Sequence, residues 1–177
     1  AGATGQVVWE QTRAVPSSWT TPIVIDAANR TQIITLGEPW VISYDAAQGN
    51  ELWRIGCLGT DLAPSPIFAG EWVIVCSPNK HVVALLPDGQ GDVTKTHVVW
   101  KYKNVVPDIT SPVSDGELLY LLTTEGTLAC LDLKTGAAVW DHALEMEFHA
   151  SPVLASGRLY LVSTEGKTVM AAAGRQY

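Results

Sequence analysis

The chain has 177 residues, of which 47% are hydrophobic and 16% charged, and this composition excludes a disordered tail or a collagen-like rod. Its net charge is −7 and it has no basic run, so a nucleic-acid partner is not expected. No stretch approaches the ~20 apolar residues that a membrane-spanning helix needs, so we expect no transmembrane segment.

The first residues and the cysteines give two expectations. The chain begins Ala1-Gly2-Ala3 without an initiator Met, a charged start or an apolar signal core, which indicates a processed chain or a part of a longer one. Cys57, Cys76 and Cys130 are too widely spaced for a C-x-x-C metal pair and are odd in number. We therefore expect them to be small buried hydrophobic residues.

Two sequence markers recur with the same period. Trp9, Trp53, Trp100 and Trp140 follow one another at 44, 47 and 40 residues, and all but Trp100 stand in a G-x-x-x-W pattern. A Ser/Thr-Pro step recurs at 44, 46 and 40 residues, in the pairs Thr21-Pro22, Ser65-Pro66, Ser111-Pro112 and Ser151-Pro152. Two markers in phase predict a repeat of about 40 to 45 residues, the length of one β-propeller blade.

Each period divides into four predicted strands. A short apolar piece follows the Ser/Thr-Pro step, and after a turn comes a run that is apolar on both faces, as in an inner strand between neighbouring sheets. These runs are 32–36, 72–76, 118–122 and 159–162. A third strand is expected to end at Asp45, Asp88 or Asp132, and after a Gly-containing turn comes the strand with the Trp.

The predicted fold is therefore an all-β propeller of four-stranded antiparallel blades, with about four blades' worth of chain in one domain, 1–177. Its pieces are approximately 5–12, 21–55, 64–103, 111–142 and 151–171. The first piece is a fourth strand and the last blade ends after its third strand, so the first strand could complete the last sheet. We favour part of a larger propeller, or a half that pairs with another copy, over a closed ring of four blades.

Two segments depart from the repeat. Residues 137–148 contain good helix formers but alternate apolar and polar side chains, and the repeat phase favours a strand. The second period has four extra residues between Gly89 and Thr96, which predicts a longer surface loop.

The segments Tyr44–Trp53 and Leu131–Trp140 resemble the D-x-x-x-G-x-x-x-W docking motif of PQQ-like β-propeller repeats, and Ser111–Leu121 fits the same repeat. The resemblance covers nearly the whole chain. It implies a ring of seven or eight blades, and the family includes quinoprotein dehydrogenases as well as non-catalytic propellers similar to the lipoprotein of the outer-membrane protein assembly machinery. The second group implies a periplasmic or otherwise extracytoplasmic location.

The motif residues are expected to pack neighbouring blades together, because one twisted sheet cannot bury both of its faces alone. Trp53, Trp100 and Trp140 are interpreted as wedges between blades and not as ligand-binding residues. The full set of predicted docking residues is Gly5, Trp9, Asp45, Gly49, Trp53, Trp100, Asp132, Gly136 and Trp140.

A candidate binding site follows from strand direction. Loops from fourth to first strands and from second to third strands emerge on one face around the axis, which we name the axial loop face. Aligning the Ser/Thr-Pro steps places five residues there that could hold a peptide, a cation or a small ligand: Trp19, Asp61, Asp108, Glu147 and His149. The alternative is that they are solvated loop residues whose Asp side chains cap turns.

The predicted function is a non-catalytic scaffold that binds a protein or peptide through the axial loop face, with strand addition to an exposed blade edge as a second route.

The alternative is a fragment of a PQQ-dependent dehydrogenase whose catalytic residues lie outside this chain. The resemblance implies that such an enzyme needs a vicinal disulfide, a catalytic Asp and Ca²⁺, and the sequence has no adjacent Cys pair. No G-x-S-x-G or H-E-x-x-H motif supports a serine hydrolase or a zinc site. We expect no catalytic, cofactor-binding or metal-binding residue in this chain. A homo-oligomer that completes the ring is a further possibility.

Overall fold

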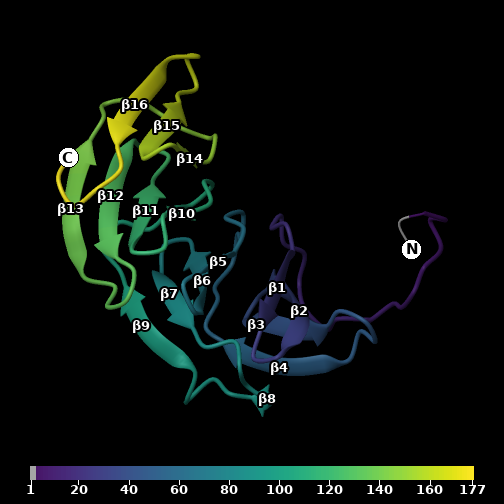
Figure 1. Ribbon diagram of the computed structural model, residues 1–177. Coiled ribbons are helices and arrows are strands. Elements are labelled where there is room, and N and C mark those ends of the chain that lie inside the picture. Colours follow the sequence, from purple (N-terminus) through teal and green to yellow (C-terminus); the bar gives the residue numbers. More distant parts are fainter. Residues whose placement is uncertain (1–2) are drawn as a thin grey trace.

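The structure is a computed structural model, and it describes residues 3–177. The described residues form β-strands, turns and loops, arranged as an open arc of four small sheets (Figure 1). In each sheet the first strand lies on the inside of the arc and the last strand on the outside. The predicted class, propeller blades of antiparallel strands, is confirmed.

Blades 1 and 2 have their own four strands in sequential order. Blade 1 contains β1 (Ile23–Ala27), β2 (Arg30–Gly37), β3 (Trp40–Asp45) and β4 (Glu51–Gly56). Blade 2 contains β5 (Ile67–Ala69), β6 (Trp72–Ser77), β7 (His81–Leu85) and β9 (Val98–Tyr102).

Blade 3 is also four-stranded, whereas blade 4 has three strands. Blade 3 contains β10 (Val113–Ser114), β11 (Leu118–Leu122), β12 (Thr127–Asp132) and β13 (Ala138–Ala143). Blade 4 contains β14 (Val153–Ala155), β15 (Arg158–Val162) and β16 (Thr168–Ala172).

The sheets repeat one irregularity beside each Trp. The pairing of third and fourth strands shifts register between Ser43 and Tyr44, between Ala84 and Leu85, and between Cys130 and Leu131. A bulge of this kind twists the strand that carries it. The fourth strands of blades 1 to 3 are thus bent at the same place, at the residue directly before the Trp.

The extra residues of the second period do more than form a loop. Residues Gly91–Asp92 form β8, which pairs in parallel with β4 of the preceding blade, in register Trp53↔Gly91 and Arg54↔Asp92. The longer loop expected between Gly89 and Thr96 therefore adds a fifth strand to blade 1. Local sequence offers no sign of this pairing, because its partner lies in the previous repeat.

The strand predicted at the start of the chain is wrong. Residues 5–11 lie against blade 1 in an extended, largely exposed segment that joins no sheet. The N-terminal segment lies at the far end of the arc from β16, so it does not complete blade 4 (Figure 1). A strand needs a neighbour to share its hydrogen bonds, and no strand lies beside this segment.

Two other boundaries differ from the prediction. Of the segment 137–148, only the first half is a strand as expected: β13 ends at Ala143, and Glu145 has a φ of +53°, which breaks the extended run. In blade 2 the third strand ends at Leu85 rather than at Asp88. Pro87 interrupts that strand, since proline has no N–H to donate.

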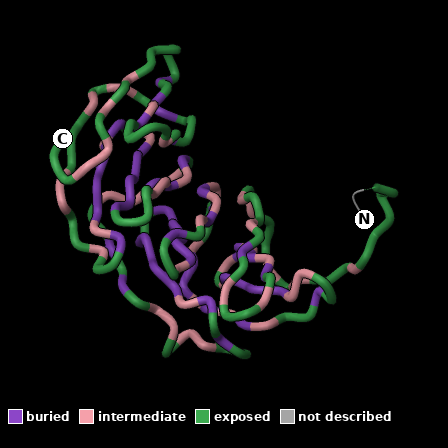
Figure 2. The backbone as a smooth tube through the Cα atoms, in the orientation of Figure 1, coloured by how far each residue is buried: buried purple, intermediate pink, exposed green. Residues whose placement is uncertain are grey.

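The apolar core lies between blades rather than inside them. Three clusters of buried residues fill the junctions of blades 1 and 2, 2 and 3, and 3 and 4. Burial is therefore strongest in the middle of the arc (Figure 2). β6 and β11 are buried on both faces as predicted, whereas β2 and β15 alternate buried with less buried positions. All three cysteines are buried and free, as expected.

Candidate functional site

Each repeated Trp reaches from its own strand or segment into the next blade. Its indole N–H donates a hydrogen bond to a backbone carbonyl of that blade, one or two residues after the end of the blade's third strand. The donor–acceptor distances are 3.0 Å for Trp9 to Ala46, 3.1 Å for Trp53 to Pro87, 3.0 Å for Trp100 to Leu133 and 2.9 Å for Trp140 to Gly174. The contact thus occurs at all three junctions, and a fourth time between the N-terminal segment and blade 1.

Two of the motif glycines are required by this contact. A Cβ on Gly49 would lie 2.5 Å from the Trp9 ring, and one on Gly136 would lie 2.6 Å from the Trp100 ring. Both glycines also have positive φ, +75° and +69°, a region that side-chain-bearing residues rarely adopt. Gly5 has no atom near its virtual Cβ.

The motif aspartates shape the turn on which the indole rests. Asp45 Oδ1 accepts hydrogen bonds from the backbone N–H groups of Ala47, at 2.9 Å, and Gln48, at 2.7 Å. Asp132 Oδ1 accepts one from Thr135 N–H at 3.1 Å. Both are Asx-type turns, in which a carboxylate satisfies backbone donors that the loop would otherwise expose.

Trp53 rests on a polar network that the sequence did not indicate. Its indole N–H also contacts Gln32 Oε1 at 2.8 Å, which accepts a second bond from Ser43 Oγ at 2.7 Å. Gln32 Nε2 in turn donates to the Pro87 carbonyl at 3.0 Å. This junction lacks the complete Asp-Gly turn, and the buried Gln supplies the hydrogen bonds instead.

The Ser/Thr-Pro steps form a hydrogen-bonded series on the axial loop face. Thr21 N–H donates to Ser65 Oγ at 2.8 Å, Ser65 N–H to Ser111 Oγ at 3.0 Å, and Ser111 N–H to Ser151 Oγ at 2.9 Å. We call this series the serine ladder. It joins the connections that enter the innermost strands, so the second sequence marker fixes the loops of one face relative to one another.

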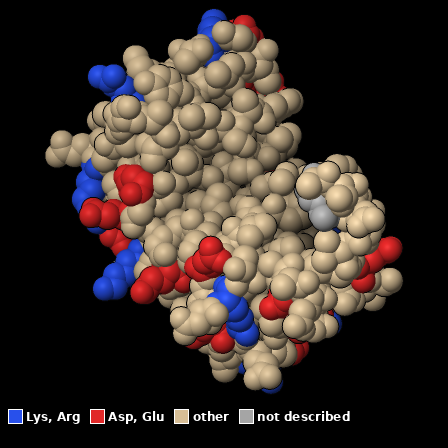
Figure 3. Space-filling model, turned by 45° about the vertical axis from the view of Figure 1, so that its right-hand side comes forward, with Lys and Arg blue, Asp and Glu red and all other residues tan. Residues whose placement is uncertain are grey.

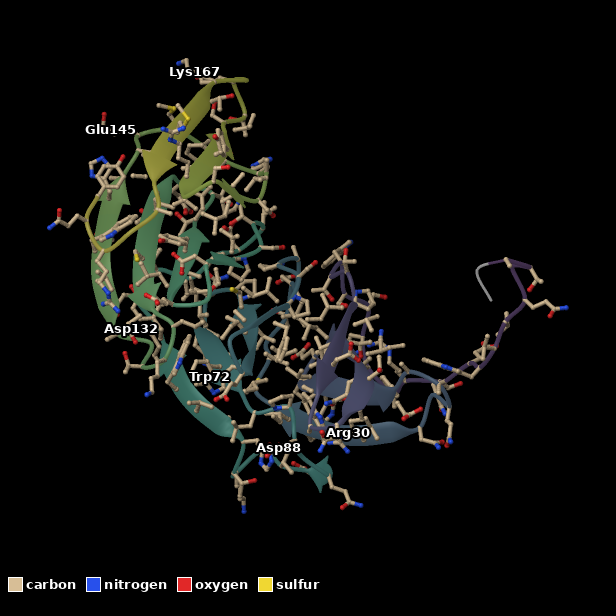
Figure 4. The ribbon with its side chains drawn as sticks, viewed as in Figure 1. Arg30, Trp72, Asp88, Asp132, Glu145 and Lys167 are labelled. Atoms are coloured by element: carbon tan, nitrogen blue, oxygen red, sulfur yellow. The ribbon has the colours of Figure 1, made fainter. Side chains whose placement is uncertain are left out.

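The axial loop face and the opposite face can be located by labelled residues. In Figure 4, Glu145 and Lys167 lie at the axial-loop end of blades 3 and 4, and Asp132 lies toward the other end. This matches the topology, because Glu145 follows β13 and Lys167 lies in the β15–β16 turn, whereas Asp132 ends β12.

Trp19 and Asp61 are exposed on the connections of this face. Trp19 has 72% of its surface exposed, and its backbone N–H donates to the Leu62 carbonyl at 2.9 Å. Asp61 is exposed and has a φ of +57°. Trp19 and the loop that contains Asp61 are therefore held side by side through their backbones, with both side chains open to solvent.

Asp108 is used inside the chain. Its Oδ1 accepts hydrogen bonds from the Thr124 hydroxyl at 2.6 Å and the Thr124 N–H at 3.2 Å, which tie its loop to the β11–β12 turn. Burial by itself raises the pKa of this carboxyl, but the hydrogen bonds from Thr124 and the backbone outweigh it, and its pKa is lowered. Asp108 therefore holds a turn of its own blade, as in the alternative interpretation that these Asp side chains cap turns.

Glu147 and His149 form an exposed pair, with Oε1 and Nε2 3.2 Å apart. Among the hydrogen bonds and ion pairs of residues 3–177, this is the one that links side chains of the five predicted residues. The predicted set thus lies along one face but is not gathered into one cluster.

A large hollow on this face, which the sequence did not reveal, lies at the outer part of the junction between blades 1 and 2. It has a volume of about 790 Å³. Its lining residues are Pro39, Trp40, Gly56, Cys57, Leu58, Lys80, Asp92, Thr94, Lys95 and Thr96. A smaller hollow of about 350 Å³, with Lys103 and Asn79 in its lining, lies at the next junction.

Buried groups behind the larger hollow are held in their neutral forms. His81 Nε2–H donates to the Cys57 carbonyl at 2.8 Å. Burial lowers the pKa of His81 and outweighs the hydrogen bond to the Cys57 carbonyl, which raises it, and Lys101, Lys80 and Lys103 lower the pKa further. Burial raises the pKa of the Cys57 thiol to about 12, so this thiol is not a nucleophile near neutral pH.

Charge is distributed unevenly over the molecule. In the view of Figure 3 the charged side chains lie mostly around the margin, and the middle of the surface is uncharged. Residues 3–177 hold no group of three or more His, Cys, Asp or Glu side chains placed to bind a metal ion. No helix in that range is long and apolar enough to cross a membrane.

Solved structures share this architecture at low sequence identity. BamB from Moraxella catarrhalis is 22% identical, with a TM-score of 0.61 over 80% of this chain and 42% of that one. The computationally designed Ika4 protein is 12% identical, with a TM-score of 0.71 over 97% of this chain and 100% of that one. Quinohemoprotein alcohol dehydrogenase ADHIIG from Pseudomonas putida HK5 is 16% identical, with a TM-score of 0.55 over 69% and 20%.

These likenesses concern the fold, and the chain spans less than half the length of the BamB structure. No curated protein sequence matches the chain. The sequence model of the family described as outer membrane protein assembly factor BamB, however, matches residues 1–176. With the repeated Trp docking contacts, this coverage shows that the chain belongs to the BamB family of PQQ-like β-propellers.

Proposed function

We propose that this protein is a non-catalytic scaffold that binds a protein or peptide through its axial loop face. The serine ladder is the observation that supports this most directly, because it fixes the backbones of successive loops while Trp19, Asp61 and His149 stay exposed. Binding sites on loops need such a rigid support, since an ordered loop loses less conformational entropy on binding.

The description of the family supports the same proposal, and it also supports a location outside the cytoplasm. A BamB-like chain is expected outside the cytoplasm, where outer-membrane proteins are assembled, and to have protein partners.

A peptide-display selection tests the proposed face. Random 12-residue peptides are selected on the wild-type chain, and their dissociation constants are then measured for Trp19→Ala with Asp61→Ala. We expect a loss of about tenfold or more if the exposed indole is a central contact. A matched variant on the opposite face, Glu71→Ala with Lys134→Ala, should keep wild-type affinity. Peptides that bind all three proteins equally would contradict the proposal.

Strand addition is a second binding route. β16 is the last strand of its sheet, and within residues 3–177 no strand pairs with its outer edge. Such an edge presents backbone N–H and C=O groups that an extended peptide can pair with. Further chain or a second copy of this one would complete the ring by the same contact.

A quinoprotein dehydrogenase fragment is the alternative function, favoured by the structural likeness to ADHIIG. The described residues do not fit a PQQ site, because Cys57, Cys76 and Cys130 are buried at separate places and no acidic cluster is placed to hold Ca²⁺. Adding PQQ with Ca²⁺ and measuring quinone absorbance and Tm tests this alternative, since a ligand that binds the folded form raises Tm. No shift would leave the scaffold proposal in place.

A further inference from the structure

Two lysines, Lys80 and Lys95, line the larger hollow, and two more, Lys101 and Lys103, lie on and just after the strand beside Lys80. Antiparallel pairing of β7 with β9, in register Val82↔Tyr102, brings Lys80 beside Lys101 and Lys103. The loop after β8 folds along β4, where Gly56 N–H donates to Thr94 Oγ1 at 2.9 Å, and this brings Lys95 to the lining of the same hollow as Lys80. We call these four the lysine group.

The lysine group forms no ion pair among the described residues. None of the ion pairs among residues 3–177 includes any of the four, whereas Lys167 pairs with Glu165 at 2.7 Å. Lys80 Nζ donates to the Leu58 carbonyl at 3.2 Å, which holds the ammonium group at the hollow. The chain has six lysines and a net charge of −7, so a local excess of positive charge here is not a reflection of composition.

The wall of the hollow is apolar. Trp40, Pro39 and Leu58 contribute to the lining, and the Arg54 guanidinium carbon lies 5.3 Å from the centre of the Trp40 ring. An aromatic wall beside positive charges suits a ligand that carries both an apolar side chain and negative charge.

Asp92 is the one carboxylate among the lining residues, and it already accepts hydrogen bonds within its own loop. Its Oδ1 accepts hydrogen bonds from the Thr94 hydroxyl at 2.6 Å and the Thr94 N–H at 3.0 Å. These bonds shape the turn that leads to Lys95. The Asp92 carboxylate is therefore held by its own loop, and it forms no ion pair with Lys95, although its charge acts on that lysine.

We propose that this hollow binds an acidic peptide segment of a partner protein, with its carboxylates on the lysine group and an apolar side chain against Trp40. The site lies on the axial loop face and rests on the proposed scaffold function, for which it specifies the chemistry of the partner. A nucleic acid fits less well, because its many phosphates would meet the negative charge of the rest of the chain.

A fluorescent peptide tests the site. The probe is a fluorescein-labelled 12-residue peptide of Asp and Glu with one central Phe, and the control peptide has Asn and Gln in place of the acids. Binding is measured by anisotropy at low and physiological salt. The acidic probe should bind more tightly than the control peptide, and its affinity should fall as salt screens the charges.

Charge-reversal variants locate the binding. Lys80→Glu with Lys95→Glu should weaken binding of the acidic probe by about tenfold or more. Lys134→Glu with Arg158→Glu makes the same change in net charge on exposed residues away from the hollow, and it should weaken binding by less than about threefold. Thermal melting of both variants verifies that each is folded.

Several results would overturn the inference. It fails if the acidic probe does not bind, if both variant pairs lose affinity equally, or if the neutral control peptide binds as well as the probe. Tighter binding of single-stranded DNA, lost in the Lys80 and Lys95 variant, would assign the site to nucleic acid. The Trp19→Ala, Asp61→Ala variant should keep the probe's affinity, so failure of this site and failure of the wider proposal are seen separately.

Discussion

At the scale of single residues, the repeated Trp combines apolar burial with one directed hydrogen bond. The Trp53 indole is fully buried and its N–H has two acceptors, whereas Trp19 has no such contact and is exposed. The same residue type thus has two roles in this chain, separated by whether it lies in phase with the Trp marker.

Trp53→Ala should lower the free energy of unfolding by about 3–5 kcal/mol, because it leaves a cavity between blades 1 and 2. Trp19→Ala is the control, and it should change stability by no more than about 0.5 kcal/mol. Urea unfolding followed by circular dichroism measures both. A loss below about 1 kcal/mol for Trp53→Ala would contradict the wedge role.

His81 should make stability depend on pH. Burial lowers its pKa in the folded chain below the unfolded value, so below about pH 6.5 the unfolded chain binds more protons than the folded one. The contribution is therefore fully present above that pH and is lost as the pH falls through the folded pKa. We expect the stability of His81→Gln to change less than that of the wild type between about pH 7 and about pH 5, as measured by Tm. Parallel curves for the two proteins would rule His81 out as the cause.

At the scale of elements, the turn after each third strand determines how closely the next blade can approach. Gly136 and Gly157 have nearly equal φ, +69° and +72°, but Gly136 lies under Trp100 and Gly157 has open space at its Cβ. The two positions therefore separate backbone strain from contact between blades.

Gly157→Ala should lose about 1 kcal/mol for the left-handed backbone alone. Gly136→Ala should lose a further 1 to 3 kcal/mol or so, because the new methyl group displaces the Trp100 indole. The difference between the denaturant midpoints of the two variants measures how much of the Gly136→Ala loss comes from the clash with the Trp100 indole. Equal losses would show that the Trp100 contact adjusts without cost.

The sequence predicted those elements whose signals lie within one repeat. The alternation of turn residues and apolar runs placed the strands, and the Asp45 and Asp132 motifs predicted their turns. β8 could not be found this way, because it pairs with β4 of the preceding repeat. The approach of Lys95 to Lys80 could not be found either, because it depends on the loop after β8 lying along β4. The predicted strand at 5–11 failed for the related reason that a good strand sequence still needs a partner strand.

The sequence predicted on which face the candidate residues lie, but not which of their side chains are free to bind a ligand. Aligning the Ser/Thr-Pro steps selected Trp19 and Asp61, which are exposed, but also Asp108, which Thr124 engages. Whether a loop carboxylate is free depends on which turn of the same blade lies beside it, and spacing along the chain does not contain that information.

At the scale of the whole molecule, blade 4 has an uncovered outer face. Val153 and Met170 are each 59% exposed and both are cross-strand neighbours of Tyr160, so they form an apolar row on one side of the sheet. The corresponding faces of blades 1 to 3 are covered by the next blade. An apolar face of this kind is a site of association.

We therefore expect the 177-residue chain to self-associate in a concentration-dependent way, with a mass above 19.0 kDa by light scattering after size exclusion. Val153→Lys with Met170→Glu should return it to the monomer mass, since both positions are outside the core. Val99→Lys, on the outermost strand of blade 2, should leave association unchanged. A monomer at all concentrations would contradict this expectation.

The serine ladder also gives the arc a direction. Every N–H in it points from one blade to the next blade along the chain, so one end of the series offers a hydroxyl to a donor and the other offers an N–H to an acceptor. Two N–H ends brought together would set donor against donor, whereas a hydroxyl at the other end can both donate and accept. Continuing the ladder beyond blade 4 would therefore need a heterologous contact, in which the last blade of one unit meets the first blade of the next.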